Sequence, residues 1–266
     1  VGLNLQAAAS RSSLAGQHQD GSLWNGALTV SGRRFNFRYS IDAISDDFRT
    51  RSGFVGRGAV ANLRLVNQVT FYGGSGGLVE RVSFDLSPLL TWRYQDLVGG
   101  AGAQDHKYHL NANARLRGGW NVSGSLLYEF QKFDPGFYAP YVLIQPSATG
   151  DSIVPFAATP RLKNVDLVLA VTTPQLGGFS GFASFVAGRD VNFFEWSRAS
   201  IVNVSLGANW RPSEQLRLDG NYVLQQYRRH SDGSIVGRTH LPRLRAEYQI
   251  SRSLFVRMVG EFRADQ

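Results

Sequence analysis

The sequence predicts an all-β protein, an up-and-down antiparallel transmembrane β-barrel of about 14 strands, of which thirteen can be located along the chain. Three observations lead to this prediction. Apolar and polar residues alternate over many successive segments, tight turns and longer loops alternate between those segments, and no run approaches the roughly 20 apolar residues that a membrane helix needs. Since alternate side chains of a strand lie on opposite faces of a sheet, each segment has one apolar and one polar face.

The clearest alternation lies between residues 201 and 263, where four strands follow one another. Val204 and Leu206, for example, alternate with Asn203 and Ser205. Such strands belong either to a membrane barrel or to a soluble sheet with one buried face. A soluble sheet of this length would need a very large polar exterior, whereas a closed barrel has no sheet edge and satisfies every backbone group in lipid. The barrel is therefore favoured.

Nine further segments alternate in the same way, the two around residues 162–189 least regularly. These are residues 1–10, 24–30, 35–43, 59–65, 82–94, 107–117, 120–130, 162–172 and 179–189. Tight turns are expected near Gly32, Gly73, Gly118, Pro174, Pro212 and Ser251, and longer connections near Gln17, Asp47, Gly100, Ala148, Glu195 and Gly233. We also expect a polar loop at residues 11–21 and a β-bulge at Pro88, because proline cannot donate a ladder hydrogen bond.

Composition narrows the class of protein. The 266 residues contain no cysteine, which excludes disulfides and thiolate metal sites. The net charge is +8, and arginine supplies nearly all of the positive charge. Because the arginines are spaced singly along polar strand faces, we expect no nucleic-acid partner. Aromatic residues near strand ends, such as Trp24, Trp92, Trp120 and Trp210, are typical of the two membrane interfaces.

Two segments resemble one bacterial group of proteins. They are residues 46–57, through Asp47-Phe48, Gly53-Phe54-Val55 and Arg57, and residues 245–257. The group joins a carbohydrate-binding module of the family-nine-like type to an uncharacterised outer-membrane β-barrel domain. The resemblance implies a single barrel domain over residues 1–266, in the bacterial outer membrane, from a longer protein with an N-terminal soluble module. An even strand number is usual in bacterial barrels, so we also expect at least one further strand after Gln266; the alternative is a strand hidden at Tyr138–Ile144.

The polar faces supply the candidate pore-lining residues. These are Arg34, Arg38, Arg64, Arg81, Arg93, Lys107, Arg115, Arg117, Arg217, Arg243, Arg245 and Arg257. A confined basic lining concentrates anionic or polyhydroxylated solutes. The alternative is a polar interior in which these cations are paired, because buried charges are normally paired. Their partners would then be Asp42, Asp85, Asp219, Glu129, Glu247 and Glu261.

The longest irregular stretch, residues 134–160, is nearly uncharged and rich in apolar residues. Its candidate contact residues are Phe137, Tyr138, Tyr141, Val142, Leu143 and Ile144. They could form a constriction in the lumen or a patch for a protein partner at the long-loop rim. The alternative is a simple extension of the two flanking strands above the membrane.

No catalytic residue, cofactor or metal ligand is expected. Asp105-His106 and Asp46-Asp47 should lie near the long-loop rim, but no nucleophile motif accompanies them. His106 and His109 should point to opposite faces of a strand, so their spacing does not indicate a metal site. The predicted function is the passage of small polar or anionic solutes, carbohydrate-related ones included, through an Arg-lined lumen. The alternative is a structural anchor or scaffold, with a closed lumen, for a carbohydrate-binding domain or a surface assembly. The lipid bilayer, with lipopolysaccharide or its equivalent, is the partner that either function implies.

Overall fold

The computed structural model describes residues 1–14, 17–50, 58–146 and 150–266. Most of the resembling segment at residues 46–57 lies outside these ranges, including Gly53-Phe54-Val55 and Arg57. No helix among the described residues is long and apolar enough to cross a membrane.

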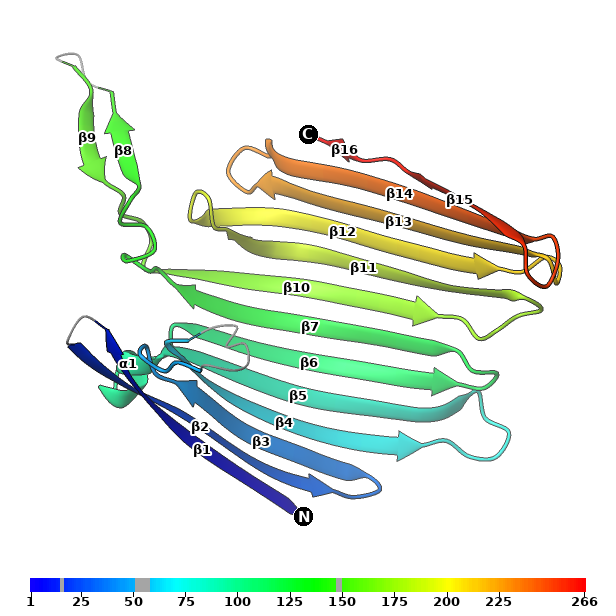
Figure 1. Ribbon diagram of the computed structural model, residues 1–266, viewed down its shortest axis with the longest axis horizontal. Coiled ribbons are helices and arrows are strands. Elements are labelled where there is room, and N and C mark those ends of the chain that lie inside the picture. Colours follow the sequence, from blue (N-terminus) through cyan, green and yellow to red (C-terminus); the bar gives the residue numbers. More distant parts are fainter. Residues whose placement is uncertain (15–16, 51–57, 147–149) are drawn as a thin grey trace.

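The chain is all-β, and its strands follow one another across a single antiparallel sheet (Figure 1). The strands of this sheet are β1 (Gly2–Leu14), β2 (Gln17–Ser31), β3 (Phe35–Ile44), β4 (Val60–Tyr72), β5 (Val79–Arg93), β6 (Asp105–Leu116), β7 (Asn121–Lys132), β10 (Arg161–Thr172), β11 (Phe179–Asn192), β12 (Ser197–Trp210), β13 (Leu216–Arg229), β14 (Ile235–Gln249), β15 (Phe255–Glu261) and β16 (Ala264–Asp265). The hairpin of β8 (Val142–Gln145) and β9 (Ser152–Pro155) is separate, and a short helix α1 (Tyr94–Val98) follows β5.

The strand order confirms the predicted up-and-down topology. β15 and β16 both pair with β14, at successive positions, so together they act as one strand and the sheet contains the thirteen strands expected. β1 and β15 form the two edges, and no pairing between them is present among the described residues. The expected turns near Gly32, Gly73, Gly118, Pro174, Pro212 and Ser251 all lie at one end of the sheet, here called the tight-turn rim, and the other connections lie at the opposite end, here called the long-loop rim. The expectation of longer connections was wrong near Gln17, Glu195 and Gly233, because the connections after β1, β11 and β13 are no longer than those of the tight-turn rim.

Cross-strand pairing separates the two faces of the sheet, because directly paired residues share a face. On the apolar face, Leu110, Leu126 and Leu167 pair in one neighbourhood of β6, β7 and β10, yet they are 51%, 47% and 44% exposed. Exposed side chains of this size over a whole sheet need an apolar environment. The opposite, polar face carries most of the ionisable side chains of the strands.

Several local expectations were wrong. Residues 11–14 and 17–21 belong to β1 and β2, whose hairpin continues until Leu14 pairs with Gln17. β5 passes through Pro88 without a bulge, because the register with β4 and β6 is unchanged there. Pairing with β4 is instead interrupted over two positions, which accommodates the missing proline N–H. Tyr94, expected in a strand, begins α1.

The connections at the long-loop rim build a small core of their own. Tyr138, Leu162, Val191 and Trp196 are buried there, and Phe133 and Phe156 pack against them. The rings of Phe133 and Tyr138 stack with centroids 5.1 Å apart, and Trp196 meets Tyr138 edge-on at 5.7 Å. We call these six residues the rim cluster.

Candidate functional site

Ten of the twelve predicted lining residues lie in strands on the polar face; Arg34 and Arg117 lie in turns at the tight-turn rim. One row of cross-strand pairs joins Arg81 to Arg115 and continues through Asn121 and Thr172 on β7 and β10. Another pairs Lys107 with Glu129. The polar face is thus one continuous surface that crosses the sheet.

Most of these cations have a carboxylate partner. Arg115 pairs with Glu80, Arg217 with Asp219, Arg243 with Glu261, and Arg245 and Arg257 with Glu247. In contrast, Arg38, Arg64 and Arg81 are exposed on β3, β4 and β5 and form no ion pair with any described residue. We call these three the lining trio. The four predicted arginines of β13–β15 are therefore all ion-paired, whereas the lining trio has no ion pair with a described residue, although Asp42 and Asp85 lie on the same face of β3 and β5.

Glu129 on β7, at 9% exposed, is one of the buried carboxylates of the polar face. Its carboxylate oxygens lie 2.8 Å from His109 Nε2 and 3.5 Å from Lys107 Nζ. His106 lies on the apolar face, where its ring meets Phe130 edge-on, so the two histidines do point to opposite faces as expected. Among the described residues, no group of three or more His, Cys, Asp or Glu side chains is arranged to hold a metal ion.

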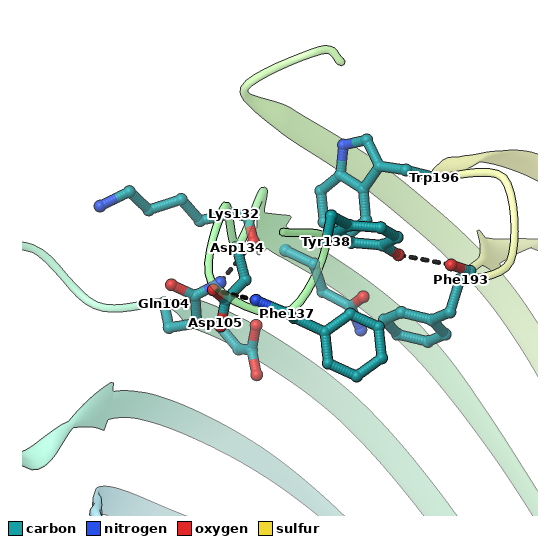
Figure 2. A pocket seen from close by; sticks show the side chains of 9 residues that line it. Gln104, Asp105, Lys132, Asp134, Phe137, Tyr138, Phe193 and Trp196 are labelled. Carbon is teal, nitrogen blue, oxygen red and sulfur yellow. Dashed lines mark hydrogen bonds between the residues drawn. The ribbon is translucent and has the colours of Figure 1, made fainter. Parts of the chain in front are cut away.

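A hollow of about 230 Å³ opens where the polar face meets the long-loop rim (Figure 2). Its apolar wall consists of aromatic rings from two connections, and its polar wall comes from β6, β7 and the start of the 134–160 segment. The lining residues are Gln104, Asp105, Gln131, Lys132, Asp134, Phe137, Tyr138, Phe193 and Trp196. Phe137 and Phe193 remain 60% and 49% exposed, so two rings are free to contact a ligand.

The polar wall is held by Asp134. Its carboxylate forms an ion pair with Arg93 and accepts a hydrogen bond of 3.0 Å from the Phe137 amide. Burial raises the pKa of Asp134, but the Arg93 guanidinium and the loop amides outweigh it and hold the pKa below its ordinary value. Gln131 is 8% exposed, and its Oε1 has no hydrogen-bond partner among the described residues. The hollow thus offers one unused acceptor beside aromatic rings.

Two hydrogen bonds join the connections across the hollow. The Tyr138 hydroxyl donates to the Phe193 carbonyl, and the Trp196 indole N–H donates to the Thr159 carbonyl at 2.7 Å. The Glu195 carboxylate accepts from Arg229 Nε at 2.9 Å, which fixes the second connection to the end of β13. The arginine's hydrogen bonds and charge hold the pKa of Glu195 below its ordinary value.

The six predicted contact residues of the 134–160 segment are divided between two places. Phe137 and Tyr138 line the hollow, whereas Tyr141 ends the packed part and Val142, Leu143 and Ile144 form β8. The β8–β9 hairpin stands beyond the ends of the main-sheet strands (Figure 1). Its apolar side chains are exposed, with Val142 at 55% and Ile144 at 64%.

Sequence reasoning missed the other half of the hollow. Phe193 and Trp196 lie in a connection expected to be an ordinary loop, and Gln131 and Asp105 were not selected as site residues. The apolar run Phe193-Phe194, with Trp196 two residues later, was the available signal, since three large aromatics in a short loop need a packing partner.

No family model and no curated protein matches the chain. The functional interpretation therefore rests on the positions and contacts of this chain's own residues.

Proposed function

We propose that the chain is the β-barrel domain of a bacterial outer-membrane protein and gives passage to small polar or anionic solutes along its polar face. The observation that supports this proposal most strongly is the contrast between the two faces of one sheet. Large exposed apolar side chains cover one face, and ionisable side chains, including the unpaired lining trio, cover the other. Lipid against the first face and water against the second would satisfy both.

The width of the sheet supports a water-filled interior. Thirteen strands spaced about 4.8 Å apart and tilted by about 40° would form a closed cylinder with a backbone diameter of about 26 Å. Barrels of about 8 strands are just wide enough for side chains to fill, so a cylinder of this size leaves room for water between its walls. The long-loop rim, with its hollow, would then stand at the mouth of the passage.

Planar-bilayer conductance with measured anion/cation selectivity tests the proposal. The wild-type protein should conduct steadily and prefer anions, because the lining trio forms no ion pair with a carboxylate in the described part of the chain. Replacing Arg38, Arg64 and Arg81 together by Gln should lower the anion preference. A folded, inserted protein that never conducts would refute solute passage.

A matched control lies on the opposite face. Lys163, Arg189 and Arg228 are also exposed and form no ion pair with a described residue, but they share the face of Val165 and Leu167. Changing these three to Gln alters the net charge by the same amount without touching the polar face. The control should keep wild-type selectivity, and an equal loss in both variants would show that selectivity follows net charge alone.

A structural anchor is the second candidate. It is favoured by the ion pairs that bridge the polar face, such as Glu247 with both Arg245 and Arg257, and by the exposed β8–β9 hairpin, where Ile153 is 70% exposed. A closed lumen and a hairpin that another protein could bind suit a membrane anchor better than a transporter. Stable insertion without conductance would favour this candidate.

A further inference from the structure

A row of paired residues crosses the apolar face near the long-loop rim. It runs from Tyr128 on β7 through Val165, Arg189 and Ser200 to Arg228 on β13. Toward the rim, the next pairs on this face are Phe130 with Lys163 and Lys132 with Arg161. Five cations therefore border the apolar side chains at this end. We call Lys132, Arg161, Lys163, Arg189 and Arg228 the outer patch.

The outer patch has no negatively charged partner among the residues that the structure describes. All five side chains are exposed, and none forms an ion pair with a described residue. Lys163 instead lies over the Phe130 ring, with its Nζ 5.7 Å from the ring centroid. Lys132 and Arg161 are directly opposite across two strands, an arrangement of like charges that costs stability. Such repulsion is relieved when a ligand supplies negative charge.

The patch is confined to one half of the sheet. On the apolar face of β1–β6, the one described arginine or lysine is Arg11, and Asp20 pairs with it at 2.7 Å. The concentration of unpaired cations on β7 and β10–β13 thus contrasts with a neutral surface beside it. A localised ligand explains this asymmetry better than a general attraction to anionic surfaces.

An apolar groove on the same face lies along the strands from the patch. It measures about 360 Å³, and Leu169, Val171, Phe185, Val204 and Leu206 contribute to its walls. Phe185 precedes Arg189 by four residues on β11, which places the groove roughly 13 Å from the nearest cation. Cations at one end of an apolar groove match an amphiphile, with its anionic group at the cations and its hydrocarbon chain in the groove.

We propose that the outer patch and this groove bind a phosphate-bearing membrane lipid, with its phosphates at the arginines and lysines and an acyl chain along the groove. Arginine and lysine are the side chains that recognise phosphate, and cations near a membrane surface favour anionic headgroups. The position of the patch, at the margin of an apolar surface, favours a lipid over a soluble polyanion. This inference rests on the proposed membrane location but not on solute passage.

The probe is diphosphorylated lipid A, titrated into phosphatidylcholine vesicles that contain the protein. Lipid retained on the protein is measured by native mass spectrometry. Changing Lys163, Arg189 and Arg228 together to Gln should weaken binding at least tenfold, since each cation near an anionic headgroup contributes an appreciable part of the affinity. The matched control is the lining trio changed to Gln, which makes the same change in net charge and should bind within about twofold of wild type.

The outcomes separate the two proposals. Equal binding by wild type and outer-patch variant, or equal loss in both variants, would overturn the lipid site. Wild type and the outer-patch variant should bind dephosphorylated lipid A with equal affinity. A difference in that affinity would contradict recognition of the phosphates. Retained conductance of the outer-patch variant shows that it is folded. Protein that fails to float with the vesicles contradicts the membrane location and the lipid site together, whereas protein that binds lipid A but never conducts contradicts solute passage alone.

Discussion

Tyr138→Phe removes the hydrogen bond that ties the two halves of the rim hollow together. Tyr138 is 2% exposed, and its hydroxyl donates to the Phe193 carbonyl from a connection 55 residues away in sequence. The substitution keeps the ring, which stacks on Phe133, and removes one oxygen atom. Any effect therefore reports the link between the connections rather than the packing of the cluster.

The size of the effect follows from the lost bond. The bond is part-buried, and a hydrogen bond of this kind contributes about 0.5–1.5 kcal/mol. If that contribution is made only while the two connections are together, the equilibrium constant for local opening should rise about 2- to 13-fold. Global unfolding should change less, because the strands keep their ladders and open independently of the rim.

Hydrogen exchange by mass spectrometry measures this opening directly. Peptides covering residues 134–141 and 192–197 should lose protection in Tyr138→Phe, while peptides within β12 and β13 should not. Tyr141→Phe is the control, because Tyr141 is 46% exposed and its hydroxyl has no hydrogen-bond partner among the described residues. Unchanged exchange in Tyr138→Phe, or the same change in both variants, would refute the idea that this hydroxyl holds the rim.

Two further predictions concern stability. Because Arg229 holds the pKa of Glu195 below its ordinary value of 4.5, the pair stabilises the protein fully above that pH, and this contribution is lost as the pH falls through the lower folded-state pKa. Thermal unfolding from pH 6 to 3 should therefore show a steeper acid loss in wild type than in Glu195→Gln; parallel profiles would contradict this assignment. On the polar face, the Phe182 ring covers Gly207 so closely that an alanine Cβ would overlap it. Gly207→Ala should lower the free energy of unfolding by about 1–3 kcal/mol, whereas Gly220→Ala, with no atom within 4 Å of the added Cβ, should have little effect in the same denaturant titration.

The strands could be predicted from the sequence because their signal is local. Period-two alternation determines both the existence of a strand and the face that each side chain occupies, so Leu206 and Ser205 were assigned to opposite faces before any contact was known. Boundaries were less certain. The polar residues 17–21 resemble a loop in composition, but pairing with β1 keeps them in β2, which is a non-local effect.

The rim hollow could not be derived in the same way. It depends on Phe193 and Trp196 meeting Tyr138, and no periodicity links residues more than 50 positions apart. The sequence showed that the segment at residues 134–160 was too apolar to stay free in water, but it contained no register to identify the surface that buries it. The sequence could not show which arginines are ion-paired and which are not, for the same reason. Arg217 and Arg64 look alike in an alternating strand, and only the structure shows that the first meets Asp219 and that the second has no carboxylate partner among the described residues.

The two sheet edges provide the most demanding test of the barrel interpretation. In lipid, an edge strand with unpaired backbone N–H and C=O groups costs several kcal/mol for each group, so β1 and β15 cannot both remain open in a bilayer. In an antiparallel series of thirteen, the first and last strands run in the same direction. Direct closure would therefore pair them in parallel, and a further antiparallel strand between them would be the other solution.

In either form of closure, the outward amides of β1 and β15 should be protected from hydrogen exchange in vesicles. The chain has no native cysteine, so single cysteines placed along β1 against Met258→Cys would cross-link only under direct closure. Rapid exchange along both edges in the membrane-bound protein would mean that the sheet does not close, and the polar face would then have no lumen to line.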